Sequence, residues 1–231
     1  MNAEQAKQEP AVRIYVWQLP VRVIHWLIFL AIIVLSATGY YIGNPMSSQP
    51  GAARDHFFTG TVRVVHLYAG YVFIASVLAR MIWMFTGNAY ARWNQFIPAS
   101  KERIHNFVGT FLFYTFIRRD PPPVRGHNAV AGASYVVVYG LMFLISLTGL
   151  ALHASAADVG SPLRWFGALV PLFGGLQVAR WIHHIIMWLL LGFTVHHVYS
   201  ALLMSVVEKT GTMESIFSGY KFVPKGEHGE S

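Results

Sequence analysis

Two pairs of adjacent histidines stand in one long apolar stretch, Arg180 to Leu203. The stretch is long and apolar enough to cross a bilayer as a helix, and ionisable side chains inside a spanning helix are costly and mark functional sites. His183 and His197 are fourteen residues apart, which on a helix is about 40° short of four turns and about 21 Å of rise. One helix face therefore offers one imidazole at each of two membrane depths. This arrangement suits two stacked haems, each needing a second axial ligand from another helix.

A second pattern is an arginine three residues before a histidine, a spacing that makes the two side chains neighbours on a helix. It occurs as Arg22 with His25, Arg63 with His66, and Arg180 with His183. The charged fork of arginine suits carboxylates, and haem has two propionates that must be neutralised near the interface. Arg80 follows His66 by fourteen residues and so shares its face at the second depth. We therefore expect Arg63 and Arg180 to bind the outer propionates. Arg22 and Arg80 are expected to bind the inner ones.

Four apolar stretches are long enough to hold these side chains within a bilayer. They cover residues 22–43, 62–85, 129–153 and 180–206. With 55% hydrophobic and 12% charged residues, the composition predicts an all-α membrane protein, a four-helix bundle forming one di-haem domain over residues 1–231. Two shorter apolar stretches predict interfacial segments, at about 106–117 and 163–176.

The distribution of lysine and arginine predicts how the bundle is oriented. The N-terminal arm, the loop 87–128 and the C-terminal tail carry eleven of these residues, whereas the two other connections carry only Arg54 and Arg164. The positive-inside rule therefore places both termini and the long loop in the cytoplasm. An even number of spans agrees with this orientation.

Depth then pairs the histidines of different spans. His25 lies near the cytoplasmic end of the first span, and His66 near the outer end of the second. Matching these depths to the last span pairs His66 with His183, and His25 with His197. The prediction is two bis-imidazole sites, one above the other, holding two b-type haems through four axial iron ligands.

Simpler interpretations exist for each residue taken alone. A histidine in a span can hydrogen-bond to a neighbouring helix, and an arginine at a span end can reach the headgroups. His184 and His196 point away from the paired faces, and we interpret them as packing or proton-site residues. A histidine-lined transporter of a transition metal is a rival from another class, but such a site should bring carboxylates or methionines to the same depth. No Asp or Glu occurs within any predicted span.

Composition excludes several other classes. The net charge of +7 could suggest nucleic acid, but the hydropathy makes membrane topology the better explanation, so no nucleic-acid partner is expected. The chain has no cysteine, which excludes iron–sulfur clusters and thioether-attached haem.

Short stretches spread along the chain carry a family resemblance. They are Val21–Trp26, Thr38–Gly43, Arg63–His66, Phe85–Asn88, Gly126–Asn128, Thr148–Gly149 and the run ending at His197–Tyr199. Together they resemble the cytochrome b subunits of membrane-bound nickel–iron hydrogenases. In that family the haem ligands fall at positions matching the four histidines paired above. His184 and His196 are less typical of it, and the resemblance gives them no role.

The resemblance implies a multi-pass anchor in the bacterial inner membrane. It would take electrons from the small and large subunits of a periplasmic hydrogenase, contact a transmembrane helix at the C-terminal end of the small subunit, and pass the electrons through two haems to quinone. The charge-poor outer connections, 44–61 and 154–179, would form the docking surface. The histidine spacing of the last span is shared with di-haem anchors of formate dehydrogenases, so an anchor of that kind is the alternative within electron transfer.

The quinone is expected beside the inner haem, at the far end of the electron path. His127 and Asn128, before the third span, are the candidates because a quinone head needs hydrogen-bonding or protonatable groups. These two residues could instead simply cap that helix. The alternative site is on the outer side, where His153 ends the same span.

Overall fold

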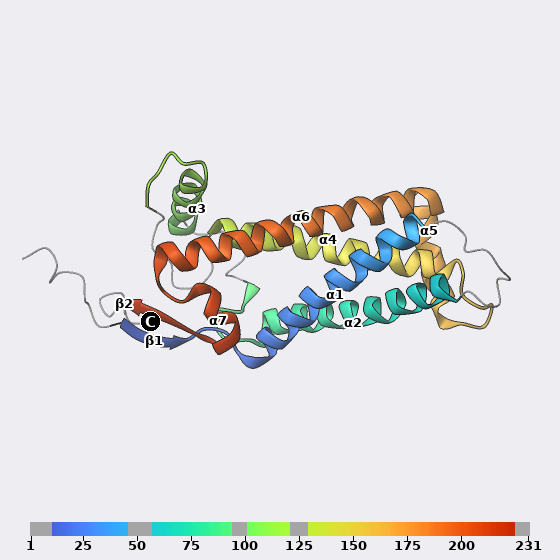
Figure 1. Cartoon of the computed structure of the whole chain (residues 1–231), viewed down its shortest axis with the longest axis horizontal. Coiled ribbons are helices and arrows are strands. Elements are labelled where there is room, and N and C mark those ends of the chain that lie inside the picture. The colour runs from blue at the N-terminus through green and yellow to red at the C-terminus, as the bar shows by residue number, and fades with distance from the viewer. Residues whose placement is uncertain (1–10, 46–56, 94–100, 121–128, 225–231) are drawn as a thin grey trace, which may run out of the picture. The chain divides into compact units, whose positions relative to one another are not determined.

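Four long helices dominate the part of the chain that the computed structural model describes, residues 11–45, 57–93, 101–120 and 129–224. They are α1 (Leu19–Gly43), α2 (Phe58–Thr86), α4 (Ala129–Ala154) and α6 (Leu176–Glu208), coloured blue, teal, yellow and orange in Figure 1. The four predicted spans are confirmed. Three of the helices begin three or four residues earlier than predicted, because helical hydrogen bonding continues beyond the uncharged runs that set the predicted boundaries.

The length and surface of these helices fit a bilayer. The shortest has 25 residues, or about 37 Å at about 1.5 Å per residue, which exceeds the hydrocarbon thickness of about 30 Å. Large apolar side chains point outward, among them Ile82 at 63%, Val137 at 62% and Val195 at 72% exposure. Lipid can solvate such side chains, whereas the backbone polar groups are satisfied within each helix. The chain is therefore a mostly helical, multi-pass membrane protein.

The chain forms two compact units, and each long helix contributes residues to both. We call the first the cavity unit (Ile24–Met81 and Val137–Thr194) and the second the terminal unit (Met1–Val23, Ile82–Val136 and Val195–Ser231). The expectation of one membrane domain over residues 1–231 stays a prediction.

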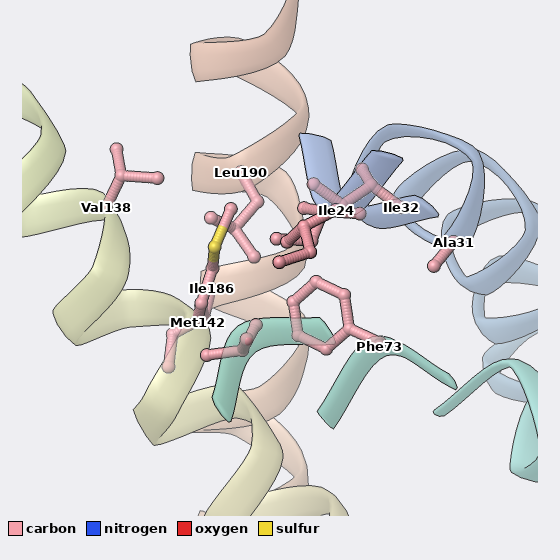
Figure 2. Close-up of a cluster of buried hydrophobic side chains, with 10 residues drawn as sticks. Ile24, Ala31, Ile32, Phe73, Val138, Met142, Ile186 and Leu190 are labelled. Atoms are coloured by element: carbon pink, nitrogen blue, oxygen red, sulfur yellow. The ribbon is translucent and has the colours of Figure 1, made fainter. Parts of the chain in front are cut away.

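The core of the cavity unit is a cluster of apolar side chains drawn from all four helices. Figure 2 shows Phe73 of α2 among residues of the other three helices, such as Ile32 of α1, Met142 of α4 and Ile186 of α6. Phe73 is 3% exposed and Ile186 3% exposed. Because these side chains interlock away from lipid, the helices hold one another at fixed rotation.

The terminal unit contains the only strands in the described part of the chain. β1 (Ala11–Tyr15) pairs antiparallel with β2 (Tyr220–Pro224), with Arg13 opposite Phe222, as the blue and red arrows in Figure 1 show. The sequence predicted only a polar arm and a polar tail here. The difference has a physical cause: the partner strands are about two hundred residues apart, so no local pattern announces their pairing.

A short helix and a glycine lead into β2. Helix α7 (Thr212–Ser218) ends at Gly219, whose φ of 87° lies in the left-handed region. A Cβ at Gly219 would lie 2.7 Å from a ring atom of Tyr15 and 2.8 Å from the carbonyl oxygen of Trp17. Only glycine fits this turn.

Three shorter elements complete the described chain. α3 (Lys101–Tyr114) covers most of the predicted segment 106–117. The predicted segment 163–176 contains the 3₁₀ helix η4 (Pro162–Ala168) and the single turn α5 (Leu169–Leu172). Their location at a membrane interface stays a prediction.

Candidate functional site

A cavity of about 800 Å³ opens inside the cavity unit. That volume falls within the range of about 300–1,000 Å³ found for cofactor and ligand sites. All four long helices line it, and most of the lining is apolar. The histidines and arginines that line it are His66, His153, His183, His184, Arg63 and Arg180. An apolar cavity with a few convergent polar groups is what a bound cofactor requires.

His66 of α2 and His183 of α6 face each other across this cavity. Their ring centres are 6.4 Å apart and the ring planes are inclined at 60°. Two imidazoles whose nitrogens each lie about 2 Å from one metal have ring centres about 6 Å apart. The pair therefore has the spacing of two axial ligands of one metal. Two imidazoles are a sufficient donor set only where the metal already has equatorial ligands, as iron has in haem.

Thr38 of α1 is within hydrogen-bonding distance of Nδ1 of His66. The Thr38 hydroxyl donates to the carbonyl oxygen of Val34 (2.7 Å), and its oxygen lies 2.8 Å from Nδ1 of His66. A hydroxyl has only one proton, and the carbonyl can only accept. With the hydroxyl proton on Val34, Nδ1 of His66 is the protonated nitrogen that donates to Thr38. Its Nε2 consequently keeps the lone pair that a metal ligand needs.

Thr148 of α4 does the same for His183. The Thr148 hydroxyl donates to the carbonyl oxygen of Ile145 (3.0 Å), and its oxygen lies 2.9 Å from Nδ1 of His183. Thr148 is fully buried, with 0% of its surface exposed. Neither Thr38 nor Thr148 was identified as functional from the sequence. Their shared signal is that each precedes a glycine within a span, as Thr38–Gly39 and Thr148–Gly149.

The two glycines that follow these threonines leave room for the imidazoles. A Cβ at Gly39 would lie 3.1 Å from Cε1 of His66, and a Cβ at Gly149 would lie 3.2 Å from Cε1 of His183. Such contacts are tight enough to push the rings by a few tenths of an ångström. Glycine at these two positions therefore allows the imidazoles to lie close to the backbone of the neighbouring helix.

The four predicted arginines are in different surroundings. Arg63 and Arg180 line the cavity, as expected for propionate partners, and Arg180 Nη1 donates to Gln177 Oε1 at 3.3 Å. Arg80 is 5% exposed and lies outside the lining of the cavity, with its guanidinium 6.0 Å from the ring centre of Tyr139. Arg22 donates to the carbonyl oxygen of Phe217 in the terminal unit. The assignment of all four to propionates stays a prediction.

The other predicted histidine pair is divided between the units. His25 belongs to the cavity unit, where its ring stands edge-on to Trp26 at 5.5 Å between ring centres. His197 belongs to the terminal unit, 6.1 Å from the ring centre of Tyr135. Their pairing stays a prediction. The quinone candidates His127 and Asn128 lie outside the described residues.

His184 is closer to the cavity than its position on the helix wheel suggested. Its Nδ1 donates to the carbonyl oxygen of Arg180 (2.9 Å), and it lines the same cavity as His183. A Cβ at Gly43 would come within 2.7 Å of Nε2 of His184. The cavity is wide enough to be lined by both adjacent histidines. His196 is exposed, with Nε2 3.4 Å from the Ser200 hydroxyl.

Comparison with known proteins gives a consistent family. The model of the family described as prokaryotic cytochrome b561 matches residues 16–219. The chain is similar to a probable Ni/Fe-hydrogenase B-type cytochrome subunit of Azotobacter chroococcum, with 35% identity over 94% of this chain and 92% of the relative. The protein of the same name from Cupriavidus necator is 33% identical over 90% of this chain and 86% of its own. A probable Ni/Fe-hydrogenase 1 B-type cytochrome subunit of Escherichia coli is 32% identical over 94% of both chains.

Proposed function

The chain belongs to the prokaryotic cytochrome b561 family, and on this premise we propose that it is the membrane subunit through which a periplasmic nickel–iron hydrogenase passes electrons to quinone. Family membership implies a b-type haem and electron transfer in the membrane. The hydrogenase partner is inferred from the names of relatives that match nearly the whole chain.

The observation that carries the proposal is the facing pair of His66 and His183. Their spacing of 6.4 Å, and the threonine hydroxyls that set their proton positions, give two Nε2 lone pairs from two helices. These side chains would hold one haem in the cavity, with Arg63 and Arg180 binding its propionates. A bound haem supplies a reversible one-electron iron couple. With haem bound, the apolar lining would exclude water and would strengthen the charge interactions of Arg63 and Arg180.

The second haem is assigned to His25 and His197, with Arg22 and Arg80 near its propionates. Helix α6 is continuous from Leu176 to Glu208. His183 and His197, fourteen residues apart in the sequence, both belong to this helix. That continuity supports two ligands from one helix at two depths. A chain with a single haem would need only one of them.

The hydrogenase is expected on the outer face, with its small and large subunits docked on the connections 44–61 and 154–179. The transmembrane helix that ends its small subunit would lie beside the bundle. Both termini would then be cytoplasmic, in keeping with the eleven lysines and arginines in the arm, the long loop and the tail. The experiment for this orientation is labelling of a cysteine introduced at the C-terminus. Since the natural chain has no cysteine, protection from an impermeant reagent in whole cells is expected, and labelling there would reverse the topology.

A reduced-minus-oxidised spectrum of the purified protein, with a haem count per chain, tests the core of the proposal. Two b-type haems per chain are expected, both reduced by hydrogen when the hydrogenase is present. A single haem would remove the site assigned to His25 and His197, and no haem would overturn the proposal.

Quinone reduction is assigned to the cytoplasmic side, at His127 and Asn128. The competing outer location is His153, which lines the cavity with its ring 6.3 Å from that of Tyr71. Two variants, His127→Ala and His153→Ala, separate the locations. We expect His127→Ala to keep haem reduction by hydrogenase and to lose quinone reduction. The same split in His153→Ala alone would move the site to the outer side.

A further inference from the structure

The cavity site is built from two similar halves. In one half, Thr38 of α1 contacts Nδ1 of His66 on the next long helix, at 2.8 Å. In the other, Thr148 of α4 contacts Nδ1 of His183 on the next long helix, at 2.9 Å. Each threonine hydroxyl also contacts a carbonyl oxygen of its own helix, and with its proton on that carbonyl it accepts from the imidazole.

The surroundings of the two contacts repeat as well. Gly39 and Gly149 follow the threonines. A Cβ at Gly39 would lie 3.1 Å from Cε1 of His66, and a Cβ at Gly149 would lie 3.2 Å from Cε1 of His183. An arginine lining the cavity precedes each histidine by three residues. The two helix pairs therefore position an imidazole in the same way. In each pair, Nδ1 of the histidine contacts a threonine hydroxyl, a glycine lies beside the ring, and an arginine lies about one helical turn before the histidine.

We propose that Thr38 and Thr148 are positioning residues for the two axial imidazoles, setting their protonated nitrogen, their ring orientation and the basicity of Nε2. The proposal rests on the assignment of His66 and His183 as haem ligands. A hydrogen bond from the distal N–H of a ligating histidine fixes the tautomer and raises the electron density at the ligating nitrogen. A more basic ligand favours the oxidised metal, so these contacts hold the potential of this haem lower than it would otherwise be.

A simpler role for both threonines is to bond only to their own helix. Thr194 of α6 shows that role alone: its hydroxyl donates to the carbonyl oxygen of Leu190 at 2.8 Å, and no contact with a histidine accompanies it in the described residues. A threonine needs no imidazole to satisfy its hydroxyl in a helix. Thr38 and Thr148 therefore contact the histidines in addition to the hydrogen bonds that their hydroxyls make within their own helices. They also satisfy an N–H that would be costly to leave unpaired in an apolar site.

The experiment compares Thr38→Val, Thr148→Val and the control Thr194→Val in the full-length purified cytochrome. Valine keeps the shape and removes the hydroxyl oxygen, which leaves the backbone carbonyls of Leu35 and Ile145 as the other acceptors near His66 and His183. We expect each of the first two variants to bind this haem about 10–100-fold more weakly, to raise its midpoint potential, and to change the low-spin ferric EPR signal, which depends on the relative orientation of the two imidazole planes. Thr194→Val should change none of the three. Thr38→Ser and Thr148→Ser should restore the native values, because serine supplies the same acceptor.

The role of the threonines and the assignment of the histidine ligands can be contradicted separately. If His66→Ala and His183→Ala each lose the haem, but both valine variants keep native affinity, potential and EPR signal, the threonines are not positioning residues and the ligand assignment stands. If His66→Ala and His183→Ala keep both haems, the ligand assignment itself fails. Where a valine variant does not accumulate, its serine counterpart decides: a shifted EPR signal despite the retained hydroxyl contradicts the proposal.

Discussion

The polar side chains of the cavity unit line a cavity, whereas those of the terminal unit hydrogen-bond to each other. In the cavity unit, His66 and His183 are held by threonines at Nδ1 and surround a space of about 800 Å³ that the protein does not fill. In the terminal unit, Trp17 and Ser215 bond to each other, and Trp17 is 8% and Ser215 1% exposed. The first arrangement leaves room for the haem proposed above, whereas the second consists of protein groups that bond to each other.

The difference indicates where a cofactor contributes to stability. A ligand that binds the folded state stabilises it by mass action, most directly where its contacts lie. Loss of haem should therefore loosen the cavity unit and spare the pairing of β1 with β2. The predictions below test this contrast, from the largest expected effect to the smallest.

The largest effect is expected from His183→Ala. Removing an axial imidazole leaves the iron with one protein ligand, so the haem of the cavity should be lost while the other remains. The measurement is the haem-to-chain ratio together with the reduced spectrum. His184→Ala is the matched control, because His184 lines the same cavity one residue away. It should keep both haems, and the reverse result would exchange the roles of these two histidines.

The buried cation of α2 gives the next largest effect. If Arg80 neutralises a propionate of the second haem, Arg80→Leu should lower the potential of that haem, because loss of positive charge favours the oxidised iron. Each change of about 1.4 kcal/mol corresponds to about 60 mV for a one-electron couple. Redox titration of both haems is the measurement. Tyr139→Phe keeps the ring, whose centre lies 6.0 Å from the guanidinium, and removes only the hydroxyl that bonds to Arg80, so it measures the contribution of that hydroxyl. Unchanged potentials in Arg80→Leu would mean that Arg80 faces another group.

How much of this arrangement the sequence could predict depends on the range of the interaction. The four spans and the approach of His66 to His183 follow from local quantities, namely the length of apolar runs and the rise of a helix. The threonine contacts do not, because Thr38 and Thr148 reach histidines on other helices whose rotation is set by the packing around Phe73. Helix spacing alone also did not show that His184 lines the same cavity, since it gives an angle but not the width of the cavity; its role as a packing or proton-site residue stays a prediction.

A smaller effect is expected for two glycines of α4. Replacement by alanine should weaken haem binding at one position and stabilise the helix at the other. A Cβ at Gly149 would press on Cε1 of His183 at 3.2 Å, whereas nothing lies within 4 Å of a Cβ at Gly140. Gly149→Ala should thus displace the imidazole and weaken haem binding. Gly140→Ala should leave the haem unchanged and stabilise the helix by up to about 1 kcal/mol, the usual preference for alanine over glycine. Haem titration and thermal unfolding in detergent distinguish the two. If both variants change haem binding and the unfolding temperature equally, helix propensity and not the contact with His183 explains the effect of Gly149→Ala.

The smallest effect on the cofactor is expected in the terminal unit. Trp17 Nε1 donates to Ser215 Oγ at 2.9 Å, and Ser215 donates in turn to the carbonyl oxygen of Thr212 at 2.6 Å. Ser215→Ala removes the hydrogen bond between the indole N–H of Trp17 and Ser215, which should cost about 1–3 kcal/mol of stability. In a Trp17→Phe background the same substitution should cost less, because this hydrogen bond is already absent. Trp165→Phe, at a side chain 85% exposed, is the control for tryptophan replacement and should be neutral.

Thermal unfolding measures the coupling between Trp17 and Ser215, and the haem-to-chain ratio is measured on the same samples. If the terminal unit is complete in itself, Ser215→Ala lowers the unfolding temperature while the haem content stays native. A parallel loss of haem would mean that the hydrogen bonds of the terminal unit also hold the cofactor site, and the contrast between the two units would fail.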